Sequence, residues 1–567
     1  MTHKKRTYED FYWLNDNSRL FLSRGYLLEG QSAEERLREI ANHAEGILQK
    51  PGFADKFYNY LAKGYYSLST PVWTNFGTTR GLPISCFGSY VPDTISGILH
   101  TASEVGMMSK YGGGTSGYLG DVRPRGAEIT NNGTSSGSVH FVKLFEQITD
   151  TISQGSSRRG RFAPYLPIDH PDIEEFLEIG VEGNEVQDVN HAVTVTDKWM
   201  LEMLSGDRDK RKIWAKVIQR RVEMGYPYIF FTDTVNRNKP EWYKDNPITH
   251  SNLCSEIALP DNDKWSFVCN LSSMNVLHYE EWKHTDAVET MIYFLDAVMS
   301  EFITKLEELR DSDDPEYTTA FTFMERAYNF AKDNRALGLG ILGWHSLLQS
   351  RMIPFASVEA SLLNEEVFKF IKERSEAASE QLAKEYGEPK HLVGTSRRNA
   401  TLQAVAPTTS SAFIIGGGSL SQSIEPLFSN QYTKDLAKTK VTIRNQYLEE
   451  VLESYGKNDR ETWLDIRNHD GSVQHLDFLT DNEREVFKTF AEINQYEIIN
   501  QASIRQRYID QGQSLNIMIN PATTTGKEMN ELYIYAWEQG IKTLYYQHST
   551  NAAQQFYQSN VCLACEA

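Results

Sequence analysis

Short apolar segments that alternate with longer helical patterns place the strongest constraint on the fold of this chain. Residues 192–196, 228–231 and 267–271 are runs of β-branched and aromatic residues, as expected for buried strands. Helical patterns, such as the one over residues 285–310, separate segments of this kind. Because strands that alternate with helices usually form a sheet covered by helices, the pattern predicts an α/β architecture.

Further patterns occur along the rest of the chain. Residues up to about 68 are typical of helices, with a capping-box start at residues 32–35. Residues 359–386 predict one long helix, and residues 430–512 are mixed and charged, with little pattern to interpret. Two late strands are expected over residues 514–519 and 541–546, on either side of a helix.

The size and charge of the chain exclude several classes of protein. Its 567 residues can bury a large core, and a chain of this length can form several domains or one large barrel with a helical appendage. A net charge of -19 argues against general affinity for nucleic acid or an anionic membrane. The basic start of the chain leads into no apolar run, and no stretch is long enough to span a bilayer. A cytoplasmic protein is therefore expected.

An amide, a thiol and a carboxylate recur at every second position in residues 251–257. In an extended segment Asn252, Cys254 and Glu256 would face the same side. The amide could hold a polar substrate, the thiol could perform redox or radical chemistry, and the carboxylate could move a proton. The spacing alone favours an ordinary half-buried strand with a polar edge, so the other motifs must decide between the two interpretations.

The cysteines are few and odd in number, which argues against a disulfide scaffold and for a reducing compartment. They are Cys86, Cys254, Cys269, Cys562 and Cys565. The last two form a C-x-x-C pair close to the C-terminus. A structural zinc site would need about four ligands and a fold around them, so a mobile dithiol that exchanges with a disulfide elsewhere is the favoured interpretation.

Three polar stretches are candidates for nucleotide binding. Glycine and arginine are concentrated in residues 111–126 and 153–161, without a Walker or dinucleotide fingerprint. Such stretches suit phosphate groups and equally suit a solvated basic loop. Residues 407–411 offer consecutive hydroxyls for a phosphate cradle. Asp93 and Thr94 could hold the sugar of a nucleotide, or could begin a helix as its N-cap.

Several motifs together carry a family resemblance. They are Ser69-Thr70-Pro71, Ser85-Cys86, Asn252-Leu253-Cys254-Ser255-Glu256, Cys269-Asn270-Leu271, Pro407-Thr408-Thr409-Ser410-Ser411, Ile424-Glu425-Pro426, Leu544-Tyr545-Tyr546-Gln547 and the terminal dithiol. From Ser69 to its end the chain resembles the large, catalytic subunit of a class I ribonucleotide reductase, and all five cysteines fall where this family uses cysteine.

The resemblance implies a fold and a division of the chain. It implies an α/β barrel of ten strands, made of two five-stranded parallel halves, with Cys254 on a finger loop inside. Residues 1–68 would be an N-terminal helical region, 69–550 the barrel and 551–567 a mobile redox tail. Because only 68 residues precede Ser69, no N-terminal ATP-binding module and no overall inhibition through one are expected.

The resemblance also implies a role for each site residue. Cys254 would be the thiyl radical that takes the 3′ hydrogen of the ribose, with Glu256 as proton acceptor and Asn252 bonded to the sugar. Cys86 and Cys269 would be the reducing pair, which Cys562 and Cys565 reset. Tyr545 and Tyr546 would carry the oxidising equivalent from a second subunit. Substrate binding falls on Thr70, Ser85, Arg158, Thr409, Ser410 and Ser411, and effector binding falls on Asp93, Thr94 and Arg123.

The implied partners follow from these roles. The chain itself would bind no metal or cofactor, while dNTP or ATP would act as allosteric effectors. A small, metal-containing subunit would generate the radical, thioredoxin or glutaredoxin would reduce the tail, and the chain would form a homodimer. An adenosylcobalamin-dependent reductase and a non-catalytic nucleotide sensor are the alternatives. The complete cysteine set argues against a sensor, and the adjacent tyrosines argue against the cobalamin enzyme.

Overall fold

Five parallel strands form the first half of a barrel in the computed structural model, which describes residues 9–155, 159–436 and 439–549. Each strand pairs with the next one along the chain. The strands are β2 (Cys86–Tyr90), β3 (Gly114–Tyr118), β4 (Arg161–Pro167), β5 (Ala192–Val195) and β6 (Tyr228–Phe231). The helices that connect or follow them are α5 (Ile95–Lys110), α6 (Ser138–Thr151), α7 (Ile173–Phe176), α8 (Asp197–Ser205), α9 (Arg208–Met224) and α10 (Thr232–Arg237).

The second half is also parallel, but its pairing is less continuous. Strand β7 (Phe267–Asn275) pairs with β8 (Leu337–Leu342), and single bridges then join Leu339 to Gln403 and Val405 to Gln513. The chain after Gln513 becomes β11 (Ile517–Ile519), which pairs with β13 (Gln547–Ser549). Five extended segments, two of them partly held by isolated bridges, therefore complete this half.

Two antiparallel seams join the halves. Strand β7 pairs with β2 at one seam, and β12 (Thr543–Leu544) pairs with β6 at the other. Gly88 lies opposite Phe267 in the first seam, where an added Cβ would come within 1.9 Å of the phenyl ring. The expected ten-stranded barrel of two parallel halves is thus confirmed. Strands β11 and β12 are shorter than the sequence patterns predict.

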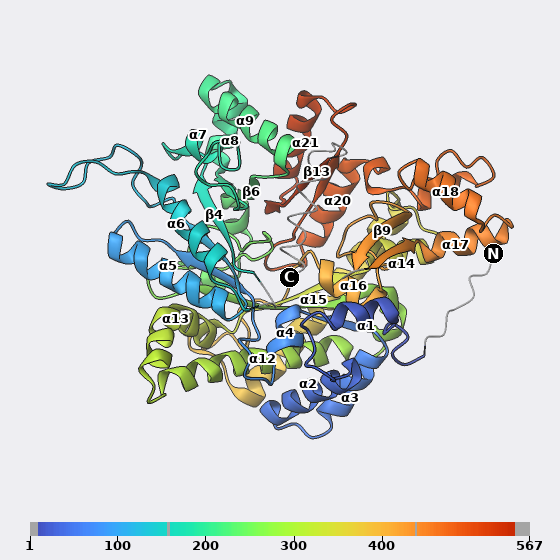
Figure 1. Ribbon diagram of the computed structural model, residues 1–567, viewed down its shortest axis with the longest axis horizontal. Coiled ribbons are helices and arrows are strands. Elements are labelled where there is room, and N and C mark those ends of the chain that lie inside the picture. The colour runs from blue at the N-terminus through green and yellow to red at the C-terminus, as the bar shows by residue number, and fades with distance from the viewer. Residues whose placement is uncertain (1–8, 156–158, 437–438, 550–567) are drawn as a thin grey trace.

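The remaining helices cover the second half (Figure 1). They are α11 (Tyr279–Trp282), α12 (Ala287–Arg310), α13 (Pro315–Asn334), α14 (Trp344–Ser350), α15 (Val358–Tyr386), α16 (Thr409–Gly416), α20 (Gln495–Gln506) and α21 (Gly526–Glu538), with short 3-10 turns η1 (Glu241–Tyr243), η2 (Val276–His278), η3 (Lys390–Leu392) and η4 (Phe490–Glu492). The helices predicted over residues 285–310 and 359–386, and the one predicted between the two late strands, are confirmed as α12, α15 and α21.

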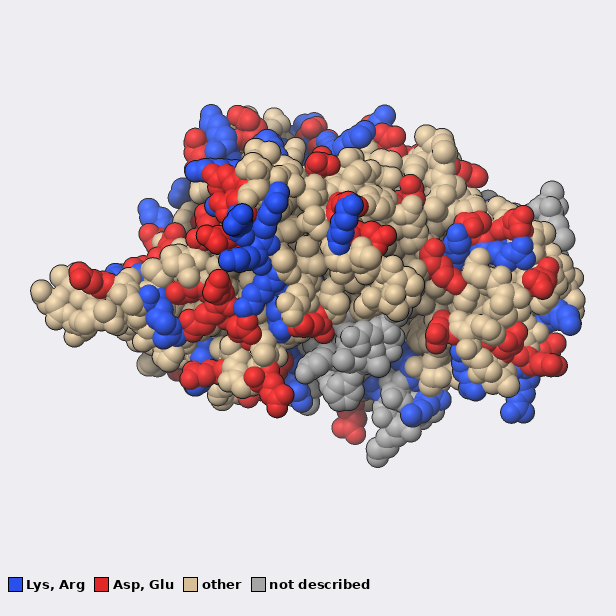
Figure 2. Space-filling view, turned by 90° about the horizontal axis from the view of Figure 1, so that it is seen from above, with Lys and Arg blue, Asp and Glu red and all other residues tan. Residues whose placement is uncertain are grey.

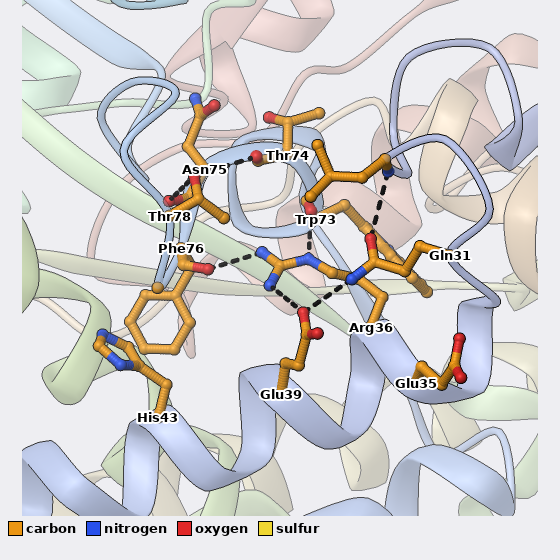
Figure 3. Close-up of polar contacts among 12 residues, drawn as sticks. Gln31, Glu35, Arg36, Glu39, His43, Trp73, Thr74, Asn75, Phe76 and Thr78 are labelled. Carbon is orange, nitrogen blue, oxygen red and sulfur yellow. Dashed lines mark hydrogen bonds and ion pairs between the residues drawn. The ribbon is translucent and has the colours of Figure 1, made fainter.

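The N-terminal helices pack against the barrel, as the first residues predict. They are α1 (Asp16–Leu22), α2 (Ala33–Leu48) and α3 (Phe53–Ala62), and Ser32 with Glu35 makes the expected capping box of α2. The chain then forms β1 (Tyr66–Leu68), a strand that the helical pattern missed, and α4 (Thr70–Asn75). Figure 3 shows Arg36 of α2 reaching the end of α4, where its buried guanidinium donates to Val72 O and Phe76 O. This contact fixes the segment that contains Thr70.

A separate helical insertion lies at the right of Figure 1. It comprises the hairpin β9 (Gln431–Leu436) and β10 (Thr439–Arg444), then α17 (Gln446–Ser454), α18 (Arg460–Asn468) and α19 (Asp481–Val486). The buried hydrophobic side chains between positions 447 and 487 form a small cluster apart from the main core. This insertion occupies the part of the chain in which the sequence predicted no particular structure.

The surface agrees with the acidic composition. Figure 2 shows acidic and basic side chains intermingled over the upper face, with no broad basic area on the described part of that face. None of the helices in the described ranges has both the length and the apolar character needed to cross a membrane.

Candidate active site

The loop that carries Cys254 lies inside the barrel and is held by both halves. From the first half, Ser116 Oγ donates to Ser251 O at 2.7 Å, and Tyr165 Oη donates to Asn252 O at 2.7 Å. From the second half, Ser514 Oγ donates to Cys254 O at 2.5 Å. Hydrogen bonds from opposite walls therefore fix the loop backbone on each side of the thiol.

The loop forms a turn, so the extended conformation predicted for residues 252–256 is wrong. Ser255 has a positive φ of 68°, and its N–H donates to Asn252 O at 3.3 Å. The Asn252 side-chain oxygen accepts hydrogen bonds from the backbone N–H groups of Glu256 and Ile257. An asparagine that hydrogen-bonds the backbone ahead of it stabilises a turn over a strand.

Asn252 nevertheless faces the reducing pair. Its side-chain Nδ2 lies 3.6 Å from Cys86 Sγ as donor, while its Oδ1 holds the turn. The amide is therefore oriented by the backbone, and its nitrogen points at one of the predicted catalytic thiols. This arrangement brings Asn252 and Cys86 together even though 165 residues separate them in the sequence.

Cys86 and Cys269 are direct partners across the seam between the halves. They lie opposite each other in the antiparallel register of β2 and β7. Opposite residues in such a pair have Cα atoms about 4.5–5.5 Å apart, which is within the range that a disulfide requires. Cys86 and Cys269 are not joined by a disulfide bond in this structure. The backbone thus presents two cysteines that can join with little rearrangement.

The environment of Cys269 keeps its thiol protonated. The side chain is buried, and burial raises the pKa of the Cys269 thiol well above its ordinary value. Gln511 Nε2 lies 3.3 Å from the sulfur and also donates to Leu337 O and Thr401 Oγ1. Sequence reasoning missed this contact, because Gln511 lies in an irregular segment without a motif.

Glu256 is buried beside the same segment. Ser514 Oγ lies 3.1 Å from Glu256 Oε2, and Gly512 N donates to Glu256 O at 2.8 Å. The Ser514 hydroxyl therefore contacts both the Cys254 backbone and the Glu256 carboxylate. Ser514 is a second site residue that sequence reasoning missed.

Tyr545 and Tyr546 lie in one aromatic cluster with Tyr228, and Cys254 packs against that cluster. Ring centroids are 4.4 Å apart for Tyr545 and Tyr546, and 4.7 Å apart for Tyr228 and Tyr545. Asn190 Nδ2 donates to the phenolic oxygens of Tyr546 at 2.7 Å and Tyr228 at 3.0 Å. The two predicted relay tyrosines are therefore in mutual contact and next to the thiol-bearing loop.

The predicted phosphate-binding hydroxyls lie at two helix starts. Thr70 begins α4, and Thr409, Ser410 and Ser411 begin α16. Strand β1 links the two, because Ser67 Oγ donates to Ser411 O at 2.7 Å. Ser410 Oγ is buried and has no hydrogen-bond partner among the described residues.

A small cavity lies beside the start of α16. Its volume is about 220 Å³, and Thr409, Glu425 and Lys434 contribute to its lining.

Ser85 lies directly before Cys86, and its carbonyl accepts from Gly114 N at 2.7 Å. The hydroxyls expected to hold substrate are thus distributed between this helix start and the beginning of β2.

The predicted effector residues lie away from the thiols, beyond the other end of β2. Asp93 and Arg123 form an ion pair, with Arg123 Nε 2.8 Å from Asp93 Oδ2. Thr94 is the N-cap of α5, and its Oγ1 accepts from Gly97 N at 3.0 Å. The helix-cap interpretation of Thr94 is therefore confirmed, and this local role does not exclude contact with a nucleotide.

Three of the predicted residues lie outside the described residues. They are Arg158, Cys562 and Cys565. The segment that precedes Arg158 is described up to residue 155, and Gln154 Nε2 donates to Asn75 Oδ1 at 2.9 Å. This bond connects the glycine- and arginine-rich stretch that includes Arg158 to α4, which also carries Thr70.

The barrel fold, with a buried thiol loop facing a cysteine pair, defines a protein of the ribonucleotide reductase class. A family model described as the ribonucleotide reductase barrel domain matches residues 84–210, 202–396 and 390–547. A second model, the all-alpha domain of ribonucleotide reductase, matches residues 12–81. The chain belongs to the family of ribonucleotide reductase large subunits.

Named relatives support this assignment. The solved class Id ribonucleotide reductase alpha subunit of Actinobacillus ureae is 51% identical, with a TM-score of 0.89 over 97% of this chain and 99% of that one. The ribonucleoside-diphosphate reductase large subunit of Invertebrate iridescent virus 3 is 30% identical over 96% of this chain and 97% of its own length. The corresponding large subunit of Danio rerio is 28% identical over 93% of this chain and 74% of its own.

Proposed function

We propose that this chain reduces ribonucleoside diphosphates to 2′-deoxyribonucleotides by a radical mechanism, as the catalytic subunit of a class I enzyme. The observation that carries the proposal is the pairing of Cys86 with Cys269 across the barrel seam, with Asn252 bonded to Cys86 and the Cys254 loop beside them. The diphosphate substrate follows from the names of the viral and fish relatives. A large subunit of this family acts with a small subunit as its partner.

The reaction assigns one step to each group. A thiyl radical at Cys254 takes the 3′ hydrogen of the ribose, and Glu256 accepts the proton of the 3′ hydroxyl. One thiol of the cysteine pair protonates the departing 2′ hydroxyl, which leaves as water. The pair supplies two electrons and two protons in total and ends as a disulfide, while C2′ gains a hydrogen. Cys254 then returns its hydrogen to C3′ and recovers the radical, and Glu256 returns the proton to the 3′ oxygen.

The surroundings of the pair suit this order of events. Because burial raises the pKa of Cys269, that thiol retains its proton until the reaction removes it. Gln511, anchored to the backbone, holds the sulfur in position beside β2. Asn252 places its amide nitrogen against Cys86. These contacts favour an oriented pair in which Cys269 keeps its proton.

Replacing Cys254 tests the assignment of the radical thiol. Cys254→Ser should lower deoxynucleotide formation by more than about 10³-fold, a loss of roughly 4 kcal/mol of transition-state stabilisation, because a hydroxyl does not replace a thiol as hydrogen-atom acceptor. The assay uses the full chain with its small subunit and a ribonucleoside diphosphate. Equal thermal unfolding and equal substrate binding would show that the variant is folded. Substantial turnover by this folded variant would refute the role of Cys254.

The C-terminal dithiol, which lies outside the described residues, is proposed to reset the pair by thiol–disulfide exchange. A Cys562→Ser/Cys565→Ser chain should lose multiple turnover with a thioredoxin-type reductant. It should still form about one deoxynucleotide per prereduced Cys86–Cys269 pair, since each pair supplies two electrons. An unchanged steady-state rate would exclude the shuttle role.

Effector control is proposed at the far end of β2. Asp93, Thr94 and Arg123 would contact a dNTP or ATP, and Arg158 would belong to the segment that transmits effector identity to the substrate. The bond from Gln154 to Asn75 supports such a connection, because it joins this segment to α4. A homodimer is the proposed assembly, with thioredoxin or glutaredoxin as reductant.

A further inference from the structure

Two imidazoles and one carboxylate meet in the helical insertion, far along the chain from any residue of the proposed active site. Asp465, His469 and His475 each offer a ligand atom, and these atoms all lie within 4.8 Å of one another. His469 Nδ1 lies 3.2 Å from Asp465 Oδ1, and His475 Nε2 lies 3.1 Å from Asp465 Oδ2. The carboxylate therefore stands between two imidazole nitrogens.

Helix α18 and His469, the residue that caps its C-terminus, place two of these groups on one face. Asp465 and His469 are four residues apart, which puts their side chains on the same side of a helix. Trp463 and Ile466 on the other side are fully buried in the small hydrophobic cluster of the insertion. Packing of the buried face thus fixes the direction in which Asp465 and His469 point.

A tight turn returns His475 to the same face. The chain reverses at Asp470 and Gly471, which have positive φ values of 54° and 82°. Gly471 N donates to Ile466 O at 2.9 Å, and an added Cβ at Gly471 would come within 1.8 Å of Ser429 Oγ. Val473, two residues before His475, is completely buried. The backbone that carries the third group is therefore fixed by its own neighbours, in addition to the contacts of His475 with Asp465 and His469.

The two histidine rings are closely stacked. Their centroids are 3.6 Å apart, with an interplanar angle of 20°. Two imidazoles and a carboxylate form a donor set that suits zinc and similar divalent transition metals, whereas magnesium and calcium prefer oxygen ligands alone. Since all three side chains are partly or fully exposed, water can complete the coordination.

We propose that Asp465, His469 and His475 form a binding site for a divalent transition-metal ion, with Zn²⁺ as the best match to the donor set. The ion would connect α18 to the segment after the turn and would stabilise the small core of the insertion. The site lies in the insertion and shares no residue with the thiol cluster or the tyrosines, and its three protein ligands would leave one position of the ion to water. The proposal does not depend on the enzymatic activity.

Zinc binding to matched variants tests the proposal. The full chain carrying Cys562→Ser/Cys565→Ser is used, because the terminal dithiol would itself bind zinc. Isothermal titration with Zn²⁺ should detect one site that weakens by at least about tenfold in His469→Gln and in His475→Gln, as expected when one of three ligands is removed. His140→Gln and His284→Gln, which change exposed histidines elsewhere, serve as controls and should bind as the parent does.

Hydrogen exchange gives an independent readout. Three side chains that only hydrogen-bond to one another would not make backbone exchange respond to Zn²⁺. Zn²⁺ should slow backbone exchange in residues 460–476 of the parent and leave exchange unchanged in His475→Gln. Equal zinc affinity in the parent and in both ligand variants would overturn the proposal. So would zinc binding that leaves exchange in this segment unaffected, since the ion would then be bound elsewhere.

Discussion

The two halves of the barrel hold the active site in different ways. In the first half, strands β2 to β6 form a continuous parallel ladder. In the second half, residues 402–405 and 511–515 form isolated bridges and a few backbone hydrogen bonds, such as those from Val405 N to Gly512 O and from Ser514 N to Val405 O. Buried side chains add to this shorter ladder. The Asp510 carboxylate accepts from Leu402 N at 2.7 Å and Gln403 N at 2.9 Å.

The same buried side chains position the reactive groups. Lys542 Nζ donates to the backbone oxygen of Gln511 at 2.7 Å, and Gln511 in turn contacts Cys269. Ser514, three residues on, contacts Glu256. The comparison indicates that the first half supports the site with a regular ladder and with bonds from Ser116 and Tyr165 to the loop, whereas the irregular second half relies mainly on individual side chains. Each half should therefore respond differently to substitution.

The largest difference in turnover is expected among variants of the clustered tyrosines. Tyr545 and Tyr546 border strands of the second half, while Tyr228 belongs to β6 of the first. Tyr545→Phe and Tyr546→Phe should each lower turnover by more than about 10²-fold, or roughly 3 kcal/mol, because each removes a phenolic proton that the relay requires. Tyr228→Phe is the matched control, since its ring packs against both, and it should retain most activity.

Steady-state turnover with the small subunit measures this difference. The isolated large subunit should be inactive with or without adenosylcobalamin. Equal activity of all three variants would show that Tyr545 and Tyr546 do not differ in role from Tyr228. Activity driven by cobalamin would place the chain in the adenosylcobalamin-dependent class.

A smaller difference is expected in stability. Asp510→Ala should cost about 2–3 kcal/mol, because it leaves two buried backbone N–H groups without their acceptor. Thr115→Val in the first half removes the bond from Thr115 Oγ1 to Arg161 O but leaves the ladder of β3 and β4 intact, so about 1 kcal/mol is expected. Denaturant unfolding gives the two values. Hydrogen exchange should accelerate at residues 402–403 only in the first variant, and equal acceleration in both would contradict the comparison.

The sequence anticipated strands of both halves where the chain carries a clear apolar run. Such runs marked β5 and β6 in the first half and β7 in the second, whereas β3, in the glycine-rich stretch 111–126, was not recognised as a strand. Residues 402–405 carry no such pattern, and isolated bridges with a few backbone hydrogen bonds hold them. The turn at Asn252 was mistaken for a strand because the two-residue spacing cannot reveal that a side chain caps the backbone. Gln511 and Ser514 act through three-dimensional contacts that no local motif encodes.

A further expected effect is a pH dependence in the second half. Burial raises the pKa of Glu425 to about 8, and the side chain accepts a hydrogen bond from Asn516 Nδ2. The folded chain therefore keeps a proton that the unfolded chain releases near its ordinary pKa of about 4.3. The stability from this group is present below about pH 4.3 and is lost as pH rises toward 8, at up to about 1.4 kcal/mol per pH unit.

Glu425→Gln should remove this contribution, because the amide keeps the acceptor for Asn516 and does not titrate in this range. The free energy of unfolding should then fall less steeply between about pH 5 and pH 8 than in the parent. Denaturant titrations at several pH values measure the slope. Identical slopes in the two proteins would show that Glu425 is ionised in the folded chain.

The most direct test of the central account is the identity of the disulfide formed in one turnover. A prereduced Cys562→Ser/Cys565→Ser chain is mixed with its small subunit and a ribonucleoside diphosphate without added reductant, then quenched and alkylated. Peptide mass spectrometry should find one Cys86–Cys269 disulfide for each deoxynucleotide, with Cys254 alkylated as a free thiol. Product formed without that disulfide, or a disulfide that includes Cys254, would contradict the assignment of the pair across the barrel seam.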